Sequence, residues 1–144
     1  MLADRERRVV VQRVVLIVLV SFAAACGGSS LPDVPDGVSV SYREHLEPLV
    51  LKRCVDCHTT EEPKANLVLE EGVGYGQMFD RASTQVPTLK LVSPGDLEES
   101  YLWLKLDQRA AVGEGMPRSF LGAKRLPPVE QERFRRWIED GALP

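Results

Sequence analysis

The sequence lacks long hydrophobic runs, an excess of positive charge and any abundance of cysteine or histidine. Its 144 residues carry 18 Lys and Arg against 21 Asp and Glu, for a formal net charge of −3. This balance argues against a basic nucleic-acid-binding protein. The chain has no series of long apolar runs, which excludes a polytopic membrane protein. Hydrophobic residues still make up 44% of the chain, enough to exclude a disordered polar protein. The length is that of about one domain.

The first 25 residues form a separate unit. Residues 1–13 are polar and basic, residues 14–22 (VVLIVLVSF) are almost wholly apolar, and three alanines precede Cys26. A basic segment, a short apolar segment and small residues before a cleavage site are typical of a secretory signal. The apolar run is shorter than the roughly 20 residues of a membrane-spanning helix. We therefore predict a signal peptide over residues 1–25.

The cysteine that follows the alanines makes this segment resemble a bacterial lipoprotein signal, although Ala23 stands where the usual motif prefers Leu. The resemblance implies that Cys26 is acylated, becomes the mature N-terminus and anchors the protein to the periplasmic side of a bacterial membrane. Gly27 favours the outer membrane over the inner one. The alternative is ordinary cleavage near Ala25, which leaves Cys26 as a spare thiol.

A polar stretch separates this signal from the folded part of the chain. Residues 27–37 (GGSSLPDVPDG) are rich in Gly, Ser, Pro and Asp and have no apolar periodicity. Such segments stay flexible or extended. We predict a tether over residues 26–37 and one folded domain over residues 38–144.

The remaining two cysteines lie in the pentapeptide CVDCH, residues 54–58. The spacing C-x-x-C-H is the attachment signature of c-type haem. On a tight helical turn, Cys54 and Cys57 can add to the two vinyl groups on one side of a porphyrin. His58 can then give the iron an axial nitrogen. We predict one covalently bound haem with His58 as an iron ligand.

Other types of site fit less well. A thioredoxin-type disulfide would need a flanking βαβ pattern, which is absent. A zinc site would need a further ligand, but His45 is the only other histidine and there is no second C-x-x-C. A chance occurrence of the motif remains an alternative. The glycine-rich residues 72–76 (GVGYG) lack the G-x-G-x-x-G spacing and a preceding strand, so we predict a flexible loop there rather than a phosphate site.

A helix is expected to lead into the cysteine motif. Residues 41–52 (SYREHLEPLVLK) can place four apolar side chains on one helical stripe: Tyr42, Leu46, Leu49 and Val50. Pro48 predicts a bend or a late helix start. His45 is expected on or near the surface of this helix, with iron ligation the minor alternative.

The second axial ligand would decide what the haem does. A methionine ligand raises the reduction potential and closes the iron to small molecules, whereas an empty position admits them. After removal of the signal, only Met78 and Met116 remain. Glycines around Met116 (GEGMP, residues 113–117) let the backbone approach the porphyrin, and Pro117 biases Met116 toward an extended conformation. We predict Met116 as the ligand and a core-packing role for Met78.

With these residues, the chain from about Tyr42 to Ala142 resembles a single-haem c-type cytochrome domain, most similar to planctomycete-type cytochrome c modules. The matching segments after the cysteine motif are ANLVL (65–69), PGDLEESYL (94–102), Met116-Pro117 and WIEDGA (137–142). The resemblance implies an all-α fold, a small helical domain around one covalently attached haem with long loops. It also implies His58 and Met116 as iron ligands. Many relatives have Met-Pro-Pro, whereas Arg118 follows Pro117 here.

Local signals predict two further helices. Asp96 can cap a helix beginning at Leu97, with Glu99 as the capping-box partner, and Tyr101 and Leu104 would lie on its buried face. A last helix should start after Pro127-Pro128 and end at Gly141, with Trp137 and Ile138 packing against the first helix or the porphyrin. Its solvated face is expected to contain Arg133, Arg135 and Arg136.

The sequence thus predicts a membrane-anchored periplasmic c-type cytochrome that carries single electrons and is not an enzyme. No catalytic residue or small-molecule substrate is identified, and no motif specifies the redox partner. The acidic charge suggests a basic docking patch on that partner. One alternative is a haem sensor or small haem enzyme with an open distal site. Another is a lipoprotein interaction module without haem.

Overall fold

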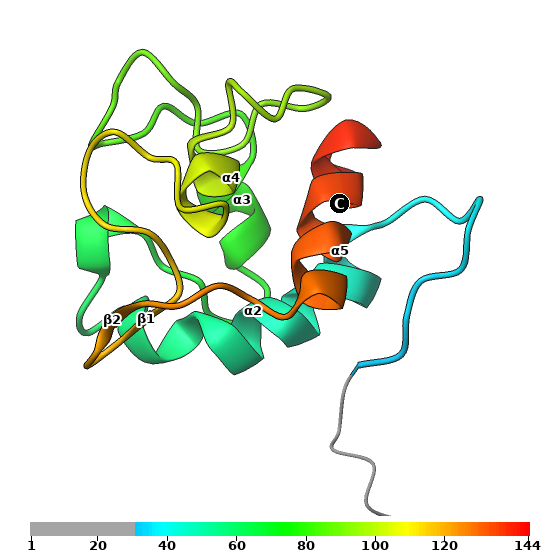
Figure 1. Ribbon diagram of the computed structural model, residues 1–144, viewed down its shortest axis with the longest axis horizontal. Coiled ribbons are helices and arrows are strands. Elements are labelled where there is room, and N and C mark those ends of the chain that lie inside the picture. Colours follow the sequence, from blue (N-terminus) through cyan, green and yellow to red (C-terminus); the bar gives the residue numbers. More distant parts are fainter. Residues whose placement is uncertain (1–30) are drawn as a thin grey trace, which may run out of the picture. The chain divides into compact units, whose positions relative to one another are not determined.

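The computed structural model describes residues 31–144. The predicted signal peptide and Cys26 lie outside the described residues. In chain order the helices are η1 (Tyr42–Leu46), α2 (Glu47–Arg53), η2 (Val55–Cys57), η3 (Lys64–Asn66), α3 (Gly74–Met78), α4 (Tyr101–Leu106) and α5 (Pro128–Glu139). Strands β1 (Arg118–Ser119) and β2 (Gly122–Ala123) pair antiparallel. Long loops join these short elements (Figure 1). Across residues 31–144, no helix combines the length and apolar character that crossing a membrane requires.

The first helix carries the predicted apolar stripe. It begins as the π-helix η1 and continues as α2 from Glu47, with Pro48 in the first turn of α2. Proline is tolerated there because its missing N–H has no partner in a first turn. The four residues of the stripe are all buried: Tyr42, Leu46, Leu49 and Val50. The expected bend or late start at Pro48 is thus a change of helix type at Glu47.

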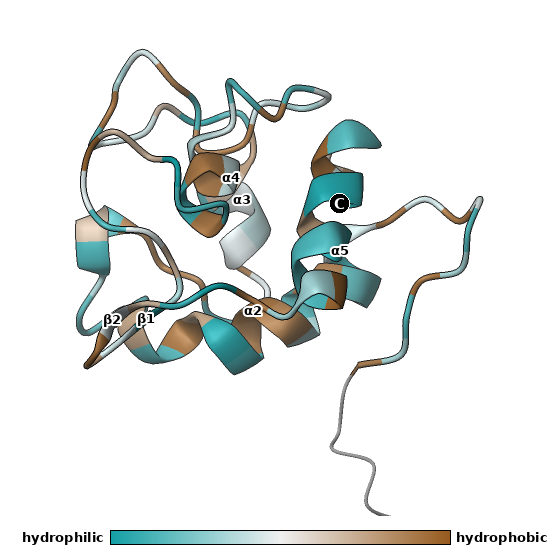
Figure 2. Ribbon diagram, in the orientation of Figure 1, coloured by the Kyte–Doolittle hydropathy of each residue, from teal (hydrophilic) through white to brown (hydrophobic). Residues whose placement is uncertain are grey.

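The last helix has the predicted position but only part of the predicted polar face. Helix α5 starts at Pro128, and Gly141 follows it with a φ of +93°. Trp137 is fully buried, and its ring centroid lies 5.6 Å from that of Tyr42. Helix α5 packs against η1 and α4. Figure 2 shows that α2 and α5 each carry both hydrophilic and hydrophobic residues.

The predicted solvated arginine face of α5 is wrong for Arg133, one of its three members. Arg133 is buried, and its Nη1 donates a hydrogen bond to the carbonyl oxygen of His45 at 3.2 Å. Arg136 donates to the carbonyl oxygens of Val34 and Val38, both at 2.7 Å. These arginines attach α5 to backbone carbonyl oxygens of η1 and of the segment before it. Arg135 and Arg136 are both half-exposed, and Arg135 pairs with acids of its own helix.

Helix α4 begins at Tyr101, four residues later than the predicted start at Leu97. The predicted cap does form, because Asp96 Oδ1 accepts the backbone N–H groups of Glu98 and Glu99 at 3.0 and 3.1 Å. It closes a turn rather than a helix. The backbone N–H of Tyr101 instead donates to the carbonyl oxygen of Lys90 at 2.8 Å, so a neighbouring loop satisfies the first donors of the helix.

The predicted loop at residues 72–76 is partly helical, because α3 begins at Gly74. This glycine lies against the first helix. A Cβ at Gly74 would lie 2.3 Å from Tyr42 Oη, so the close approach of α3 to Tyr42 requires glycine. The two helices are thereby held together beside the residues that follow the cysteine motif.

Candidate functional site

A cavity of about 470 Å³ brings together the four residues predicted to hold a cofactor. Cys54, Cys57, His58 and Met116 all line it. The first three come from one turn of chain, whereas Met116 comes from the loop between α4 and β1. The volume falls in the range of about 300–1,000 Å³ that is usual for ligand and cofactor sites. The structure therefore joins a local motif to a residue far away in the sequence.

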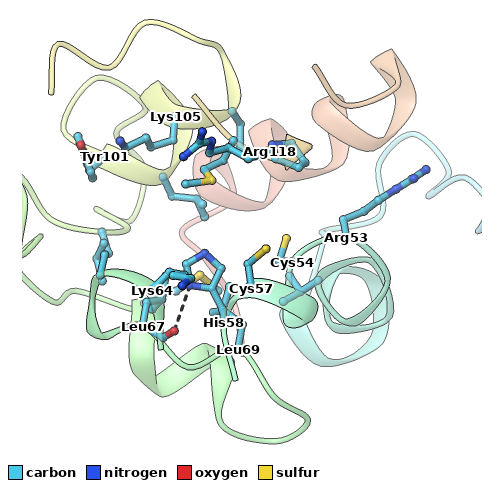
Figure 3. Close-up of a pocket in the computed structure, with 18 of the residues that line it drawn as sticks. Arg53, Cys54, Cys57, His58, Lys64, Leu67, Leu69, Tyr101, Lys105 and Arg118 are labelled. Carbon is cyan, nitrogen blue, oxygen red and sulfur yellow. Dashed lines mark hydrogen bonds between the residues drawn. The ribbon is translucent and has the colours of Figure 1, made fainter. Parts of the chain in front are cut away.

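The cysteine motif forms a tight turn at the end of α2. The backbone N–H of Cys54 donates to Val50, closing the helix, and the N–H of Cys57 donates to the carbonyl oxygen of Cys54 at 3.2 Å. Both thiols are free. Figure 3 shows both sulfur atoms pointing the same way, toward the cavity. Burial and the neighbouring Cys57 thiol raise the pKa of Cys54 to about 12. Cys54 is therefore a neutral thiol at neutral pH, and the two sulfur atoms face the same side of the cavity.

His58 is held as a neutral and oriented imidazole. Its side chain is buried, and Nδ1 lies 3.1 Å from the carbonyl oxygen of Leu67 (Figure 3). A carbonyl can only accept, so Nδ1 carries the hydrogen and Nε2 keeps a free lone pair. Desolvation lowers the pKa of His58, outweighing backbone hydrogen bonds at Leu67 and Lys64 that raise it. This state is the one in which imidazole binds metal ions.

Two residues of the α4 region, Lys105 and Gln108, hold the loop that delivers Met116. The backbone N–H of Met116 donates to the carbonyl oxygen of Lys105 at 2.9 Å. Gln108 Nε2 donates to the carbonyl oxygen of Met116, also at 2.9 Å. Lys105 Nζ donates to Val112 and Glu114 in the same loop. The sequence interpretation missed both of these residues.

Two glycines allow this loop to lie close to the side chains of Lys105 and Gln108. A Cβ at Gly115 would lie 1.8 Å from Gln108 Oε1, and one at Gly113 would lie 2.5 Å from Lys105 Nζ. Gly113 also has a φ of +67°, a conformation that side chains disfavour. The structure thus shows these glycines close to Lys105 and Gln108, and their approach to a porphyrin stays a prediction.

The lining of the cavity is apolar with a one-sided charge. Its hydrophobic members include Val50, Leu67, Leu69, Met78, Leu91, Leu102, Leu106 and Phe134. Its charged members are all cationic: Arg53, Lys64, Lys105 and Arg118. Among the described residues, no Asp or Glu lines the cavity, although the chain as a whole is acidic. Such a lining suits a ligand with a large apolar body and negative groups at its edge.

Met78 and His45, the two weaker candidates for an iron ligand, differ in their position relative to the cavity. Met78 is buried and lines the same cavity as Met116. His45 is absent from the lining, and its Nδ1 accepts the backbone N–H of Ser41 at 3.0 Å. The structure thus places Met78 within the site and His45 outside it.

The residues present fit a covalently attached haem. Two thiols on one side can attach this group, an imidazole and a thioether can ligate its iron, and apolar walls suit its ring. Within residues 31–144, no group of three or more His, Cys, Asp or Glu side chains is arranged to hold a metal ion. The chain matches no protein-family model, no curated protein and no solved structure.

Proposed function

We propose that the protein is a c-type cytochrome that carries single electrons outside the cytoplasm. The observation that carries the proposal is the meeting of Cys54, Cys57, His58 and Met116 on one apolar cavity. Haem supplies the one-electron chemistry, because its iron exchanges between ferrous and ferric states. Cys54 and Cys57 would hold the porphyrin through thioether bonds, and His58 and Met116 would ligate the iron. The protein's role is to bind, orient and desolvate this group.

The hydrogen bond from His58 to Leu67 supports the proposed role of the imidazole. It fixes the tautomer and the ring orientation, and a donated Nδ1–H makes Nε2 a stronger ligand. The lowered pKa of His58 keeps the ring free of a competing proton at neutral pH. His58 can therefore act as a ligand without losing free energy to deprotonation or rearrangement.

The anchoring of the Met116 loop supports a closed sixth position on the iron. The main chain of Met116 is held on both sides, through its N–H by Lys105 and through its carbonyl by Gln108. A thioether presented from a fixed loop competes well with water and small molecules, because little conformational entropy is lost on ligation. A closed position favours electron transfer over gas sensing or oxidation chemistry.

The proposed location is the periplasmic face of a bacterial membrane, with lipid on Cys26 and a tether that ends before Val34, because Val34 is buried in the domain and its carbonyl oxygen accepts from Arg136. The predicted tether over residues 26–37 therefore extends too far toward the C-terminus. The basic, apolar and small-residue pattern before Cys26 supports this location. Replacement of Cys26 by Ser should move the exported protein from the membrane fraction to the soluble fraction. Retention of the C26S protein in the membrane fraction would remove the lipid anchor from the proposal.

The direct test is the mass of the exported protein, expressed with its own signal in a host that attaches haem to c-type cytochromes. The wild-type chain should carry the added mass of one haem through denaturation. A Cys54→Ser, Cys57→Ser double variant should lack it, whereas Cys26→Ser should retain it. Free thiols at both Cys54 and Cys57 of the wild-type product would refute the proposal.

A further inference from the structure

Lys105 is a buried positive charge on the wall of the cavity. Its side chain is 5% exposed. Nζ donates to the carbonyl oxygens of Val112 at 2.9 Å and Glu114 at 3.0 Å, and lies 4.9 Å from the centroid of the Tyr101 ring. An ammonium group has three N–H donors, and these two carbonyls account for two of them. The third donor is available for a further partner.

Lys105 differs from the other cations of the lining in its ion pairing. The other three cations of the lining each pair with a carboxylate: Arg53 with Glu130, Lys64 with Glu62, and Arg118 with Glu114. Among residues 31–144, no carboxylate lies within ion-pair distance of Lys105 Nζ. Burial of a charge without an opposite charge is unfavourable, so buried cations are normally paired. A ligand that fills the cavity is placed to supply the negative group.

The surroundings of Lys105 form a polar part of a largely apolar cavity. Tyr101 Oη donates to the carbonyl oxygen of Val112 at 2.6 Å and lies 3.0 Å from Gln85 Oε1. Tyr101, Lys105 and Gln85 all line the cavity, together with Ser83 and Thr84. Figure 3 shows Tyr101 and Lys105 on the wall opposite Cys54. The polar groups thus gather far from the thiols.

We propose that the third N–H of Lys105 binds a carboxylate of the cavity's ligand, at a subsite that Tyr101 and Gln85 border. The inference rests on the proposed function, under which that carboxylate is a haem propionate. The vinyl and propionate groups of haem lie on different edges of the ring, so attachment at Cys54 and Cys57 directs the propionates away from the cysteines. Lys105 then binds the propionate and the Met116 loop with one ammonium group, and joins the cofactor to the loop that supplies its second ligand.

The subsite is tested by NMR on the haem-loaded protein in its diamagnetic reduced state. Nuclear Overhauser effects are expected between the methylene protons of one propionate and the ring protons of Tyr101, and between those methylenes and the side chain of Lys105. Propionate contacts only with other cations of the lining, such as Arg118, would overturn the inference.

A set of variants gives a second readout, the midpoint potential of the loaded protein. Lys105→Met should lower the potential, because loss of a nearby positive charge favours the ferric state. Lys105→Arg should restore most of the difference. Lys124→Met is the matched control, since it removes one positive charge from an exposed residue outside the lining. Equal shifts for K105M and K124M would contradict the subsite.

These outcomes separate the subsite from the proposed function. A wild-type chain without attached haem would refute both proposals. A haem-loaded chain whose propionates lie away from Lys105 would refute the subsite and leave the cytochrome assignment standing. Should K105M fail to fold, the NMR contacts of the wild-type protein still decide the question.

Discussion

At the scale of single residues, the two methionines of the cavity make the sharpest comparison. Met116 stands in an anchored loop, whereas Met78 is packed in α3 and is 1% exposed. Met116→Ala should leave the haem attached, lower its potential and allow carbon monoxide to bind the ferrous iron, because the sixth position opens. Potentiometry and absorption spectra measure both changes.

Met78→Ala is the matched variant. It removes a buried side chain and should cost about 2–5 kcal/mol of unfolding free energy, without carbon monoxide binding. Denaturant unfolding of the loaded protein measures this loss. If Met78→Ala opened the iron and Met116→Ala did not, the ligand assignment would pass to Met78.

Gly115 is predicted to control how firmly Met116 is presented. A Cβ there would meet Gln108 Oε1, so Gly115→Ala should displace the Gln108 side chain and break its hydrogen bond to Met116. We expect a loss of about 1 kcal/mol in unfolding free energy and faster carbon monoxide binding than in the wild type. Stopped-flow mixing of reduced protein with carbon monoxide measures the rate.

The control for Gly115 is Gly76, which lies within α3 and would place a Cβ in open space. Gly76→Ala should raise the unfolding free energy by about 0.5–1 kcal/mol, because alanine is the better helix former. Its carbon monoxide kinetics should match the wild type. Equal kinetics for all three proteins would show that Gly115 does not govern the loop.

At the scale of elements, local sequence patterns predicted where the helices lie along the chain better than the residues at which they begin. The stripe around Leu46 and the last helix before Gly141 followed from spacing alone, because each buries one face against neighbours close by. The start of α4 was wrong because the carbonyl oxygen of Lys90 replaces a side-chain cap. Arg133 was assigned to solvent because helical charge usually faces water, but the carbonyl of His45 gives it a partner. Local sequence patterns do not predict hydrogen-bond partners that lie far away in the sequence.

Asp107, at the end of α4, joins three segments and predicts a dependence of stability on pH. It accepts hydrogen bonds from Arg109 at 2.6 Å, Arg125 at 3.0 Å and Gln131 at 3.2 Å. The hydrogen bonds from Arg109 and, second, Arg125 lower the pKa of Asp107 below its ordinary value of 3.8. A lowered folded-state pKa stabilises the fold above 3.8, and the contribution disappears as the pH falls through the folded-state pKa.

Asp107→Asn should therefore destabilise the protein by about 1 kcal/mol at neutral pH, a modest value because the carboxylate is partly exposed. The difference from the wild type should shrink as the pH is lowered below 3.8. Thermal unfolding at several pH values measures it. A deficit that stays constant down to acid pH would mean that packing, and not charge, is what Asp107 contributes.

At the scale of the whole molecule, the sequence predicted only part of the candidate site. CVDCH is contiguous, so its three candidate residues could be read directly from the sequence. The burial of Lys105 could have been predicted from the sequence, because Lys105 lies one helical turn after Tyr101 and so on the buried face of α4. The acidic net charge gave no hint of a cavity with only cationic charges, because a total says nothing about where charges gather. Gln108 could be found only from the folded loop.

A cavity of this size makes the stability of the whole domain depend on what fills it. The lining brings apolar side chains from α2, α4 and α5 to one space of about 470 Å³, and a small domain has little other core. The Cys54→Ser, Cys57→Ser chain without haem should therefore unfold at a lower temperature and with a broader transition than the loaded wild type, because its walls stay hydrated and Lys105 stays without a counter-charge. Circular dichroism during heating measures the transition, with Cys26→Ser as a control that retains both thiols of the motif. If the double variant melted as sharply and at the same temperature as Cys26→Ser, the fold would not need a ligand in this cavity.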